Sequence, residues 1–293
     1  MKNQKFGAIS LFTAAGFYGL YGIFSRLIGT SFGSFSQNWV RNLIVLALIA
    51  GVIVIRKTKL LAIRKEDLKW IILWLLSGSW VTVLTFIAFN NLQIGTTYLI
   101  IYSSMIAAGF ISGKIFFKEK LNISKTASLV LCFLGLVIIY RFSISSNEVI
   151  YVILAFTSGF MTGVWNTISK KFSDHYSNNQ IVMMDAAGGV IAALIGSMLF
   201  KEKLPMESSS VKWFWIFVYA LVQTVNVGLI VYGFKNIEAQ VGSIILPVEI
   251  IFATLFSYFV FKEYPQPATY LGGLLIISAA ILPNINAVLY RRT

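Results

Sequence analysis

The tetrapeptide Phe117-Lys118-Glu119-Lys120 recurs 144 positions later as Phe261-Lys262-Glu263-Tyr264, and this repetition decides the fold. The same offset relates Gly19-Leu20-Tyr21 to Gly163-Val164-Trp165, Ser25-Arg26 to Ser169-Lys170, and the small-residue pair Ala15/Gly19 to Gly159/Gly163. One offset therefore fits segments at both ends of each half. This self-similarity predicts an internal duplication, with a first repeat over residues 1–145 and a second over residues 146–293.

The composition is typical of a membrane protein. The chain has 293 residues, of which 57% are hydrophobic and only 12% charged, and its mean hydropathy is +0.79. A soluble domain carries about twice that share of charge. Because a membrane span needs about 20 apolar residues, the sequence predicts an all-α polytopic protein with ten transmembrane helices. The expected spans are 6–26, 36–55, 70–90, 96–117, 124–141, 149–170, 180–200, 213–234, 238–261 and 268–289.

Five spans in each half make the second repeat inverted, because an odd number of crossings turns the next repeat upside down. Basic residues collect in cytoplasmic loops. With the N-terminus in the cytoplasm, 17 of the 24 Lys and Arg residues fall on that side and 6 on the other, while Arg41 lies within a span. We therefore expect a multi-pass protein of the cytoplasmic membrane with both termini cytoplasmic. The excess of basic residues that gives the net charge of +13 then lies mainly on the cytoplasmic side, and no nucleic-acid partner is expected.

Inverted repeats are typical of secondary transporters, whose substrate site lies near the midplane at the repeat interface. The two Phe-Lys-Glu motifs, the segment Tyr232–Glu249 and Arg41 early in the second span together resemble the ten-helix EamA-type branch of the drug/metabolite transporter superfamily. The resemblance implies export or exchange of small metabolites such as amino acids, usually without ATP. The family often carries Pro in both repeat-related spans. Here Pro247 is present but position 103 is Ser, so the resemblance supports a hinge only in the second half.

Three ionisable residues lie inside predicted spans, where charges are costly and usually functional. Glu249 is 11 residues into its span, or about 16 Å deep at 1.5 Å per residue, which is the midplane. We expect it to be a protonation site coupled to transport or a counter-charge for a substrate amine; a structural hydrogen bond is the third reading. Arg41 and Asp185 occupy equivalent repeat positions at mirrored depths, which favours gating or end charges over a salt bridge between them.

Polar and aromatic residues gather at the same depth as Glu249. Ser79 and Thr82 share one helix face, and their repeat mates Gln223 and Asn226 share another. This pattern predicts a lined midplane cavity, with helix–helix hydrogen bonding as the rival explanation. The remaining candidates for the cavity are the fourth-span Ser103 and the aromatic residues Trp80, Trp165 and Tyr21, of which Trp80 is the preferred wall for an apolar substrate.

The sequence contains no phosphate-binding loop, metalloprotease motif or dinucleotide fingerprint, so we expect no enzyme activity, no catalytic residues, no metal and no cofactor. The expected function is secondary transport of a small molecule by alternating access. A lipid scramblase or a membrane-embedded enzyme is the alternative from another class. Substrate, transport direction, coupling ion and oligomeric state are open at this point.

Overall fold

The computed structural model describes residues 3–29, 32–140, 148–202 and 209–289, and these residues form helices joined by short turns, without a strand among them. The helices are α1 (Gln4–Gly19), α2 (Tyr21–Ile28), α3 (Ser34–Ile55), α4 (Lys65–Ser79), α5 (Val81–Asn91), α6 (Ile94–Phe117), α7 (Ile123–Ile139), α8 (Val149–Ile168), α9 (Asn178–Leu199), α10 (Ser210–Asn236), α11 (Ala239–Ile245), α12 (Glu249–Phe261) and α13 (Pro267–Leu289). Eight spans are long and apolar enough to cross a membrane, and two shorter apolar helices complete the ten. The prediction of an all-α protein with ten spans is confirmed.

Three of the described spans are broken. The first bends at Leu20 between α1 and α2, the third at Trp80 between α4 and α5, and the ninth at a 3-10 turn over Leu246–Val248 between α11 and α12. Pro247 explains the last break, because a proline removes a helical hydrogen bond and clashes with the preceding turn. The repeat mates of these spans, α8, α10 and α6, run unbroken through the matching positions. The ninth span is thus broken at Pro247, where the resemblance supports a hinge, and α6 is continuous through Ser103.

Local sequence explains where several helices begin and end. The Asn122 side chain accepts a hydrogen bond from the Lys125 N–H at the start of α7, and Ser177 caps α9 in the same way. Helices α6 and α12 end at Lys118 and Lys262, whose φ angles are 54° and 59°. A residue with a left-handed backbone conformation at this point ends the helix and turns the chain back over the last helical turn. Both Phe-Lys-Glu motifs are therefore helix ends with the same bend.

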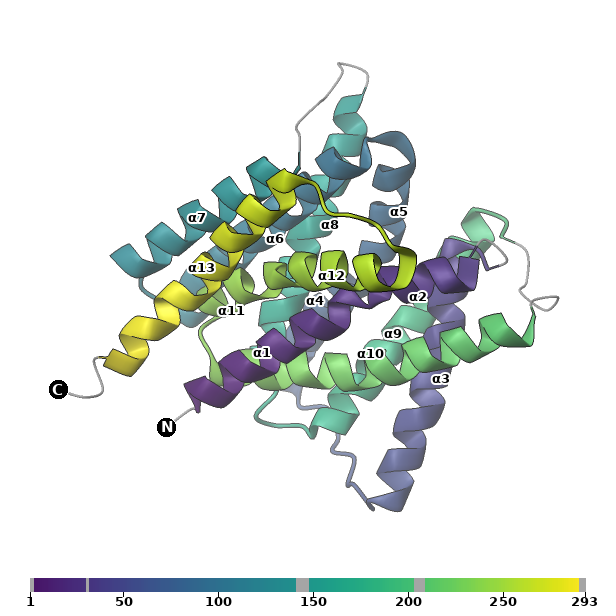
Figure 1. Ribbon diagram of the computed structural model, residues 1–293. Helices are drawn as coiled ribbons and strands as arrows, with labels where there is room; N and C mark the ends of the chain where they lie inside the picture. The colour runs from purple at the N-terminus through teal and green to yellow at the C-terminus, as the bar shows by residue number, and fades with distance from the viewer. Residues whose placement is uncertain (1–2, 30–31, 141–147, 203–208, 290–293) are drawn as a thin grey trace.

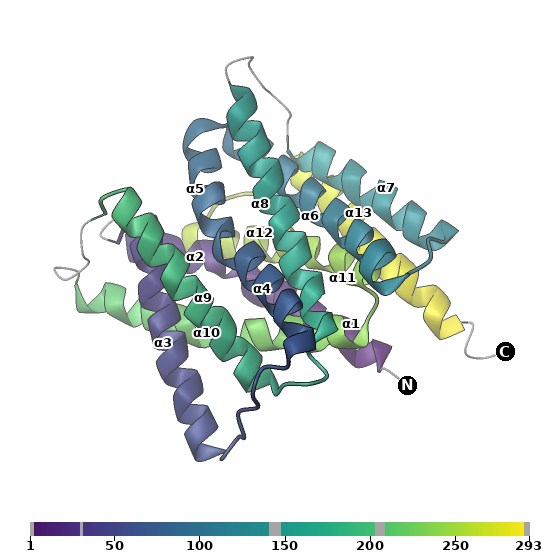
Figure 2. The ribbon, with the colours of Figure 1, turned by 180° about the vertical axis from the view of Figure 1, so that it is seen from behind.

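The two halves pack through pairs of repeat-related helices (Figures 1 and 2). Helix α3 packs on its mate α9, and α7 on its mate α13. The contact of α6 with α8 is mirrored by that of α1 with α12, and the contact of α1 with α10 by that of α8 with α4 and α5. The start of α1 and the end of α13 lie on the same side of the bundle, which we call the terminal end, and the opposite side is the distal end (Figure 1).

Small residues allow the two halves to approach closely, as the Ala15/Gly19 and Gly159/Gly163 pairs predict. A methyl group built on Gly163 would lie 2.3 Å from the carbonyl oxygen of Met105 on α6. One built on Gly19 would lie 2.8 Å from the backbone nitrogen of Ala253 on α12. Glycines at helix crossings let backbones come together and gain van der Waals contact. These crossings join the first half to the second at repeat-related positions.

We expect Gly163→Ala to destabilise the protein by about 1–3 kcal/mol, because the added methyl group meets backbone, which cannot move aside cheaply. Thermal unfolding in detergent should show a lower midpoint. Gly51→Ala on α3 is the matched control, since nothing lies within 4 Å of a methyl group there. It should leave the midpoint unchanged or raise it slightly, because Ala favours helix over Gly. Equal loss of stability in both variants would contradict the close crossing.

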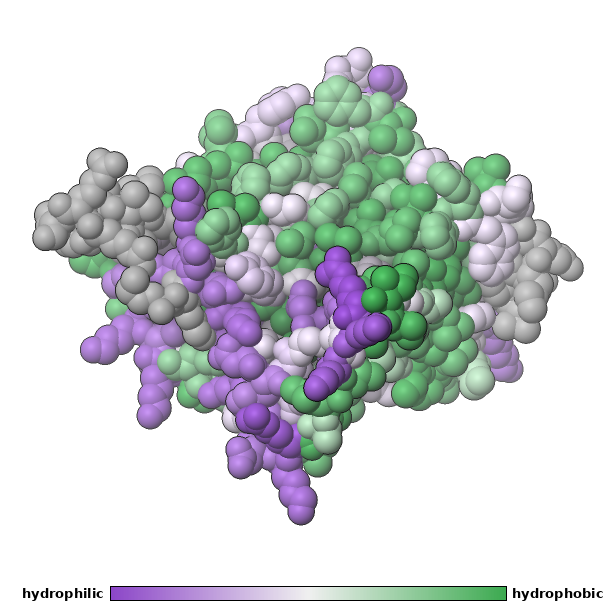
Figure 3. Space-filling view, turned by 90° about the horizontal axis from the view of Figure 1, so that it is seen from below, coloured by the Kyte–Doolittle hydropathy of each residue, from purple (hydrophilic) through white to green (hydrophobic). Residues whose placement is uncertain are grey.

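The surface follows the sequence pattern. Exposed basic residues, among them Arg56, Lys57 and Lys59, follow α3 at the terminal end. Figure 3 shows hydrophilic residues gathered on one part of the face seen from below, with hydrophobic residues over most of the rest. Many large apolar side chains of the spans are exposed, such as Ile123 and Val54. A bilayer would cover this apolar surface.

Candidate functional site

A cavity of about 680 Å³ lies between the two halves. Its described lining comes from the first four spans of the first half and from their four mates in the second, while α7 and α13 contribute none of it. The lining reaches Ser34 and Asn90, which are exposed at the distal end. At depth it reaches Trp165 and Leu246. The cavity therefore opens toward the distal end.

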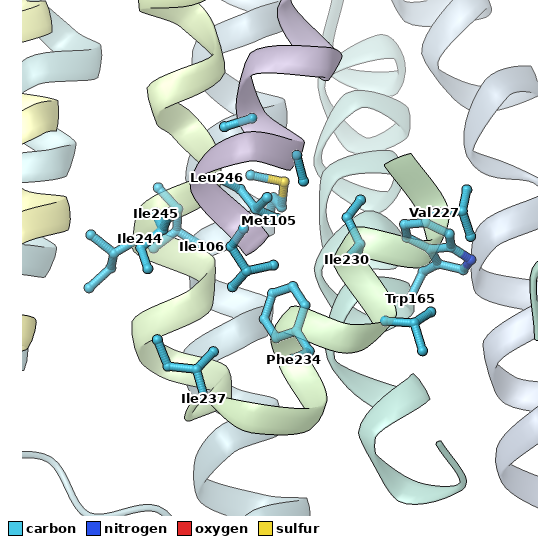
Figure 4. Packing of buried hydrophobic residues seen from close by; sticks show 14 of the residues in the cluster. Met105, Ile106, Trp165, Val227, Ile230, Phe234, Ile237, Ile244, Ile245 and Leu246 are labelled. Carbon is cyan, nitrogen blue, oxygen red and sulfur yellow. The ribbon is translucent and has the colours of Figure 1, made fainter. Parts of the chain in front are cut away.

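A hydrophobic floor closes the cavity from below. Met105, Trp165, Val227 and Leu246 line the cavity and also belong to the main buried cluster. Figure 4 shows them beside the buried residues that continue this packing. The further members labelled there are Ile106, Ile230, Phe234, Ile237, Ile244 and Ile245. Because such a layer excludes water, it separates the cavity from the terminal end.

Polar contacts between the halves close the terminal end below this floor. The Lys170 ammonium pairs with Glu119 at 3.0 Å, and Lys171 donates to the Phe116 carbonyl at 2.6 Å. Asp67 is buried and contacts His175 Nδ1 at 2.8 Å while it accepts from the Tyr176 hydroxyl at 3.0 Å. Each contact joins the first repeat to the second. This end is sealed while the distal end is open.

Arg41 begins a chain of oriented amides across the cavity wall. It can only donate, and its guanidinium donates to Asn38 Oδ1 at 2.6 Å, so the Asn38 amide nitrogen faces Thr82 Oγ1 at 2.9 Å. The Asn42 nitrogen donates to the Asn38 backbone and side-chain oxygens, both at 2.9 Å. Its own oxygen therefore faces Gln223, whose nitrogen donates to it at 2.9 Å. One arginine thus fixes the orientation of three amides, those of Asn38 and Asn42 on α3 and of Gln223 on α10.

This chain leaves specific polar atoms for a ligand. Gln223 Oε1 is buried without a hydrogen-bond partner among the described residues, and so are Asn166 Oδ1 and Arg41 Nε. All three side chains line the cavity. Since an unsatisfied buried polar group costs about 1–3 kcal/mol, these atoms favour a ligand that supplies donors to the two amide oxygens and an acceptor to the arginine.

Tyrosine rings hold the Arg41 guanidinium in place. Its carbon lies 4.1 Å from the centre of the Tyr219 ring and 5.8 Å from that of Tyr21. The two rings meet edge to face with centres 4.7 Å apart. A cation over an aromatic face is stabilised without losing its charge. Arg41 therefore presents a positive charge to the cavity rather than to a protein carboxylate.

Two carboxyl groups line the same cavity. Asp185 on α9 accepts a hydrogen bond from Trp165 Nε1 at 2.8 Å. Glu249 is the first residue of α12, directly after the 3-10 turn, and accepts from the Tyr102 hydroxyl of α6. A helix start favours a carboxylate because its free N–H groups carry partial positive charge. The break at Pro247 therefore creates the position that Glu249 occupies.

The structure brings together most of the residues that the sequence singles out. Those that line the cavity are Glu249, Ser79, Thr82, Gln223, Trp165, Tyr21, Arg41 and Asp185. Arg41 and Asp185 come from packed helices and reach one cavity, and none of the ion pairs of the described residues joins them.

Three predicted residues are not among the described lining. Trp80 lies at the break between α4 and α5, and Ser103 is half-buried on α6. Asn226 is fully buried and donates to the Tyr21 hydroxyl at 3.2 Å, so it supports a lining residue from behind. A cavity role for Trp80 and Ser103 stays a prediction.

Sequence reasoning missed several lining residues. Asn38 and Asn42 lie three residues before and one after Arg41, and their spacing of four puts them on one helix face. A search for amides around the buried charge would have found them. Tyr102 and Tyr219 carried no such signal, because tyrosines are common throughout these spans.

The arrangement described so far, two inverted five-span halves around a polar cavity, is that of a membrane transporter. The chain belongs to the EamA-like transporter family, which matches it twice, over residues 5–141 and 149–285. The two matches correspond to the two repeats. The resemblance drawn from the Phe-Lys-Glu motifs is thereby confirmed.

The chain is also similar to two other proteins. A protein of Synechocystis sp. described as an uncharacterized transporter is 36% identical over 84 residues, which are 27% of this chain and 23% of that protein. The match thus spans less than a quarter of this relative. A crystal structure of another protein has a TM-score of 0.79 at 14% identity and covers 95% of this chain and 98% of its own. This likeness shows the fold alone.

Proposed function

We propose that the chain is a secondary transporter that exports or exchanges small zwitterionic metabolites such as amino acids across the cytoplasmic membrane. The observation that carries the proposal is one cavity with a positive pole at Arg41 and a negative pole at Asp185 and Glu249. A substrate carboxylate fits the guanidinium, which binds carboxylates through paired donors. A substrate ammonium group fits the carboxylates and the two free amide oxygens of Gln223 and Asn166.

The apolar walls of the cavity suit an organic side chain. Aromatic rings of Trp165, Tyr98, Phe86 and Phe89 line the cavity beside its polar groups. Ligand sites typically combine apolar walls with a few oriented polar groups in this way. The volume of about 680 Å³ is within the ordinary range for small-molecule sites.

Alternating access is supported by the opposite condition of the two ends. The cavity is open to the distal end, while polar contacts and the hydrophobic floor close the terminal end. Transport then needs the reverse state, in which the terminal end opens and the distal end closes. The excess of basic residues at the terminal end supports a cytoplasmic position for it. Under the proposal, this structure is the outward-open state of the cycle.

Uptake into proteoliposomes tests the proposal. Purified protein is reconstituted and offered a panel of radiolabelled amino acids, amines and organic acids, with and without a pH gradient and with unlabelled substrate inside. Protein-free liposomes and a Gly51→Ala protein are the controls for leakage and for handling. Saturable uptake of at least one zwitterion, with weaker uptake of its amine and acid analogues, is expected. No uptake of any solute by folded protein would overturn the proposal.

The same vesicles separate the alternatives from another class. A scramblase would expose fluorescent headgroup-labelled lipid to an external quencher at a rate above that of protein-free liposomes. A membrane-embedded enzyme would change the chemical identity of the offered solute. Under the proposal, the lipid arm matches the protein-free control, and the solute is recovered unchanged from the vesicle interior.

A further inference from the structure

The two Phe-Lys-Glu motifs make matching contacts at opposite ends of the molecule. At the terminal end Glu119 pairs with Lys170, and at the distal end its mate Glu263 pairs with Arg26, the mate of Lys170. Each cation also lies over the Phe ring of the same motif, 4.8 Å from Phe117 in one case and 4.0 Å from Phe261 in the other. The repeat therefore preserves a three-residue contact between neighbouring spans.

The helix end that carries each Glu is also the same. The Glu119 N–H donates to the Gly113 carbonyl at 2.9 Å, and the Glu263 N–H lies 3.5 Å from the carbonyl of Ser257, the mate of Gly113. The left-handed lysine before each Glu produces this bend. The motif thus aims a carboxylate back across the end of its own helix toward the neighbouring span.

The two carboxylates differ in their other partners and in their exposure to solvent. Glu119 also accepts the backbone N–H groups of Ala239 at 2.7 Å and Gln240 at 3.0 Å, at the start of the ninth span. Lys170, Glu119 and these two N–H groups form what we call the terminal clamp. Gly113 makes room for it, because a methyl group there would lie 2.6 Å from Glu119 Oε2. The clamp is nearly closed to solvent, with side-chain exposures of 11% for Lys170 and 5% for Glu119.

Its counterpart, the distal pair of Arg26 and Glu263, is exposed to solvent. The two side chains are 53% and 50% exposed, and besides Arg26 the Glu263 carboxylate accepts from the Ser257 hydroxyl. The Arg26 guanidinium holds the pKa of Glu263 below its ordinary value, so the pair is ionised at neutral pH. By the repeat, the groups equivalent to the N–H of Ala239 and Gln240 are those of Gly95 and Thr96 at the start of α6.

We propose that the two motifs are alternating clamps, of which one is engaged in each state. In the state described here, Glu119 ties the ends of spans four and six to the start of span nine and closes the terminal end. When the distal end closes, Glu263 takes the N–H groups at the start of α6, and Glu119 releases those of span nine. The two motifs then exchange roles, in line with the repeat symmetry of their contacts. This inference rests on the proposed transport function for its purpose.

The mated substitutions Glu119→Gln and Glu263→Gln test the proposal, because they should move the protein in opposite directions. Each removes the carboxylate that the proposal places on backbone N–H groups in only one state, so it weakens the charge-assisted hydrogen bonds to those N–H groups in that state. Two reporters follow the states in a Cys132→Ala background: Thr85→Cys, which lines the cavity, and Ser243→Cys, which is buried at the terminal end. A water-soluble maleimide should label Thr85→Cys when the distal end is open and Ser243→Cys when the terminal end is open.

We expect Glu119→Gln to raise the labelling rate of Ser243→Cys and lower that of Thr85→Cys, by up to about tenfold for a shift of one charge-assisted bond. Glu263→Gln should do the reverse, and the double variant should return toward the parent protein. Glu66→Gln, an exposed acid at the terminal end, is the control and should change neither rate.

The labelling needs no substrate, so it fails or succeeds independently of the transport assay. Opposite shifts in the two single variants support the clamps even if no solute in the panel is transported. Shifts in the same direction, or none, would overturn them even if transport is found. Thermal unfolding of each variant separates a shift between states from partial unfolding, which should expose both reporters together.

Discussion

Arg41→Ala is expected to lower the transport efficiency of a zwitterionic substrate by about 100-fold. Removing one partner of a buried, hydrogen-bonded charge pair costs about 2–5 kcal/mol, and each 1.4 kcal/mol is a factor of ten. Arg41 is the positive pole of the cavity, and its Nε has no partner among the described residues. Initial rates of uptake against substrate concentration give the measurement.

The chemistry of the substrate makes this prediction specific. Uptake of the amine that lacks the carboxylate should fall much less in Arg41→Ala, because it never used the guanidinium. Arg41→Lys should be intermediate, since an ammonium group keeps the charge but not the paired donors. Arg56→Ala, an exposed arginine at the terminal end, should behave as the parent protein. An equal loss for acid-bearing and acid-free substrates would show that Arg41 only supports the fold.

Glu249→Gln is expected to abolish accumulation driven by a pH gradient, while exchange without a gradient continues. The substitution keeps the shape of the side chain and its contact with Tyr102, but the amide cannot take up or release a proton. Glu249 lines the cavity at the break in the ninth span, so under the proposed alternating access a proton bound there would move with that helix. Uptake with imposed gradients between pH 5.5 and 8.5 gives the measurement.

Two further variants assign the coupling to one carboxyl group. Tyr102→Phe removes the hydrogen bond to Glu249 but leaves the carboxyl, so gradient-driven accumulation should persist with a shifted pH profile. Asp185→Asn should weaken substrate binding without removing the response to the gradient. If Glu249→Gln accumulates substrate with an unchanged pH profile, the coupling idea fails. If Asp185→Asn alone loses the response, the coupled proton belongs to Asp185.

The fold could be predicted from the sequence because it is determined by long apolar segments and by a long internal repeat. Ten apolar segments of about 20 residues have few alternatives in a bilayer, and the 144-residue offset fixed their grouping. The breaks at Leu20 and Trp80 had no comparable signal, since neither involves a proline. They depend on packing against partner helices, which a single sequence does not display. Only the break with Pro247 could be anticipated.

The site was predictable in depth but not in direction around each helix. Ser103 and Tyr102 lie at almost the same depth, yet one residue turns the helix by about 100°, and Tyr102 is the one that lines the cavity. Trp80 misses the described lining although its neighbours Ser79 and Val81 belong to it. Arg41 and Asp185 were expected near opposite faces. They share a cavity because α3 packs directly on α9 and both helices contribute to its lining.

The breaks in three spans make repeat-related helices of the duplicated molecule mechanically different from each other. Joints lie at Leu20, Trp80 and Leu246–Val248, whereas the corresponding stretches of α8, α10 and α6 are continuous rods. A carrier with identical halves would meet the same resistance in both directions of its swing. Here the breaks lie in one member of each related pair, so the two end states of the proposed transport cycle are not equivalent, and we expect the forward and return transitions to cross barriers of different height. We expect such a carrier to reach the equilibrium that its gradients set, while it fills and empties a vesicle at unequal speeds.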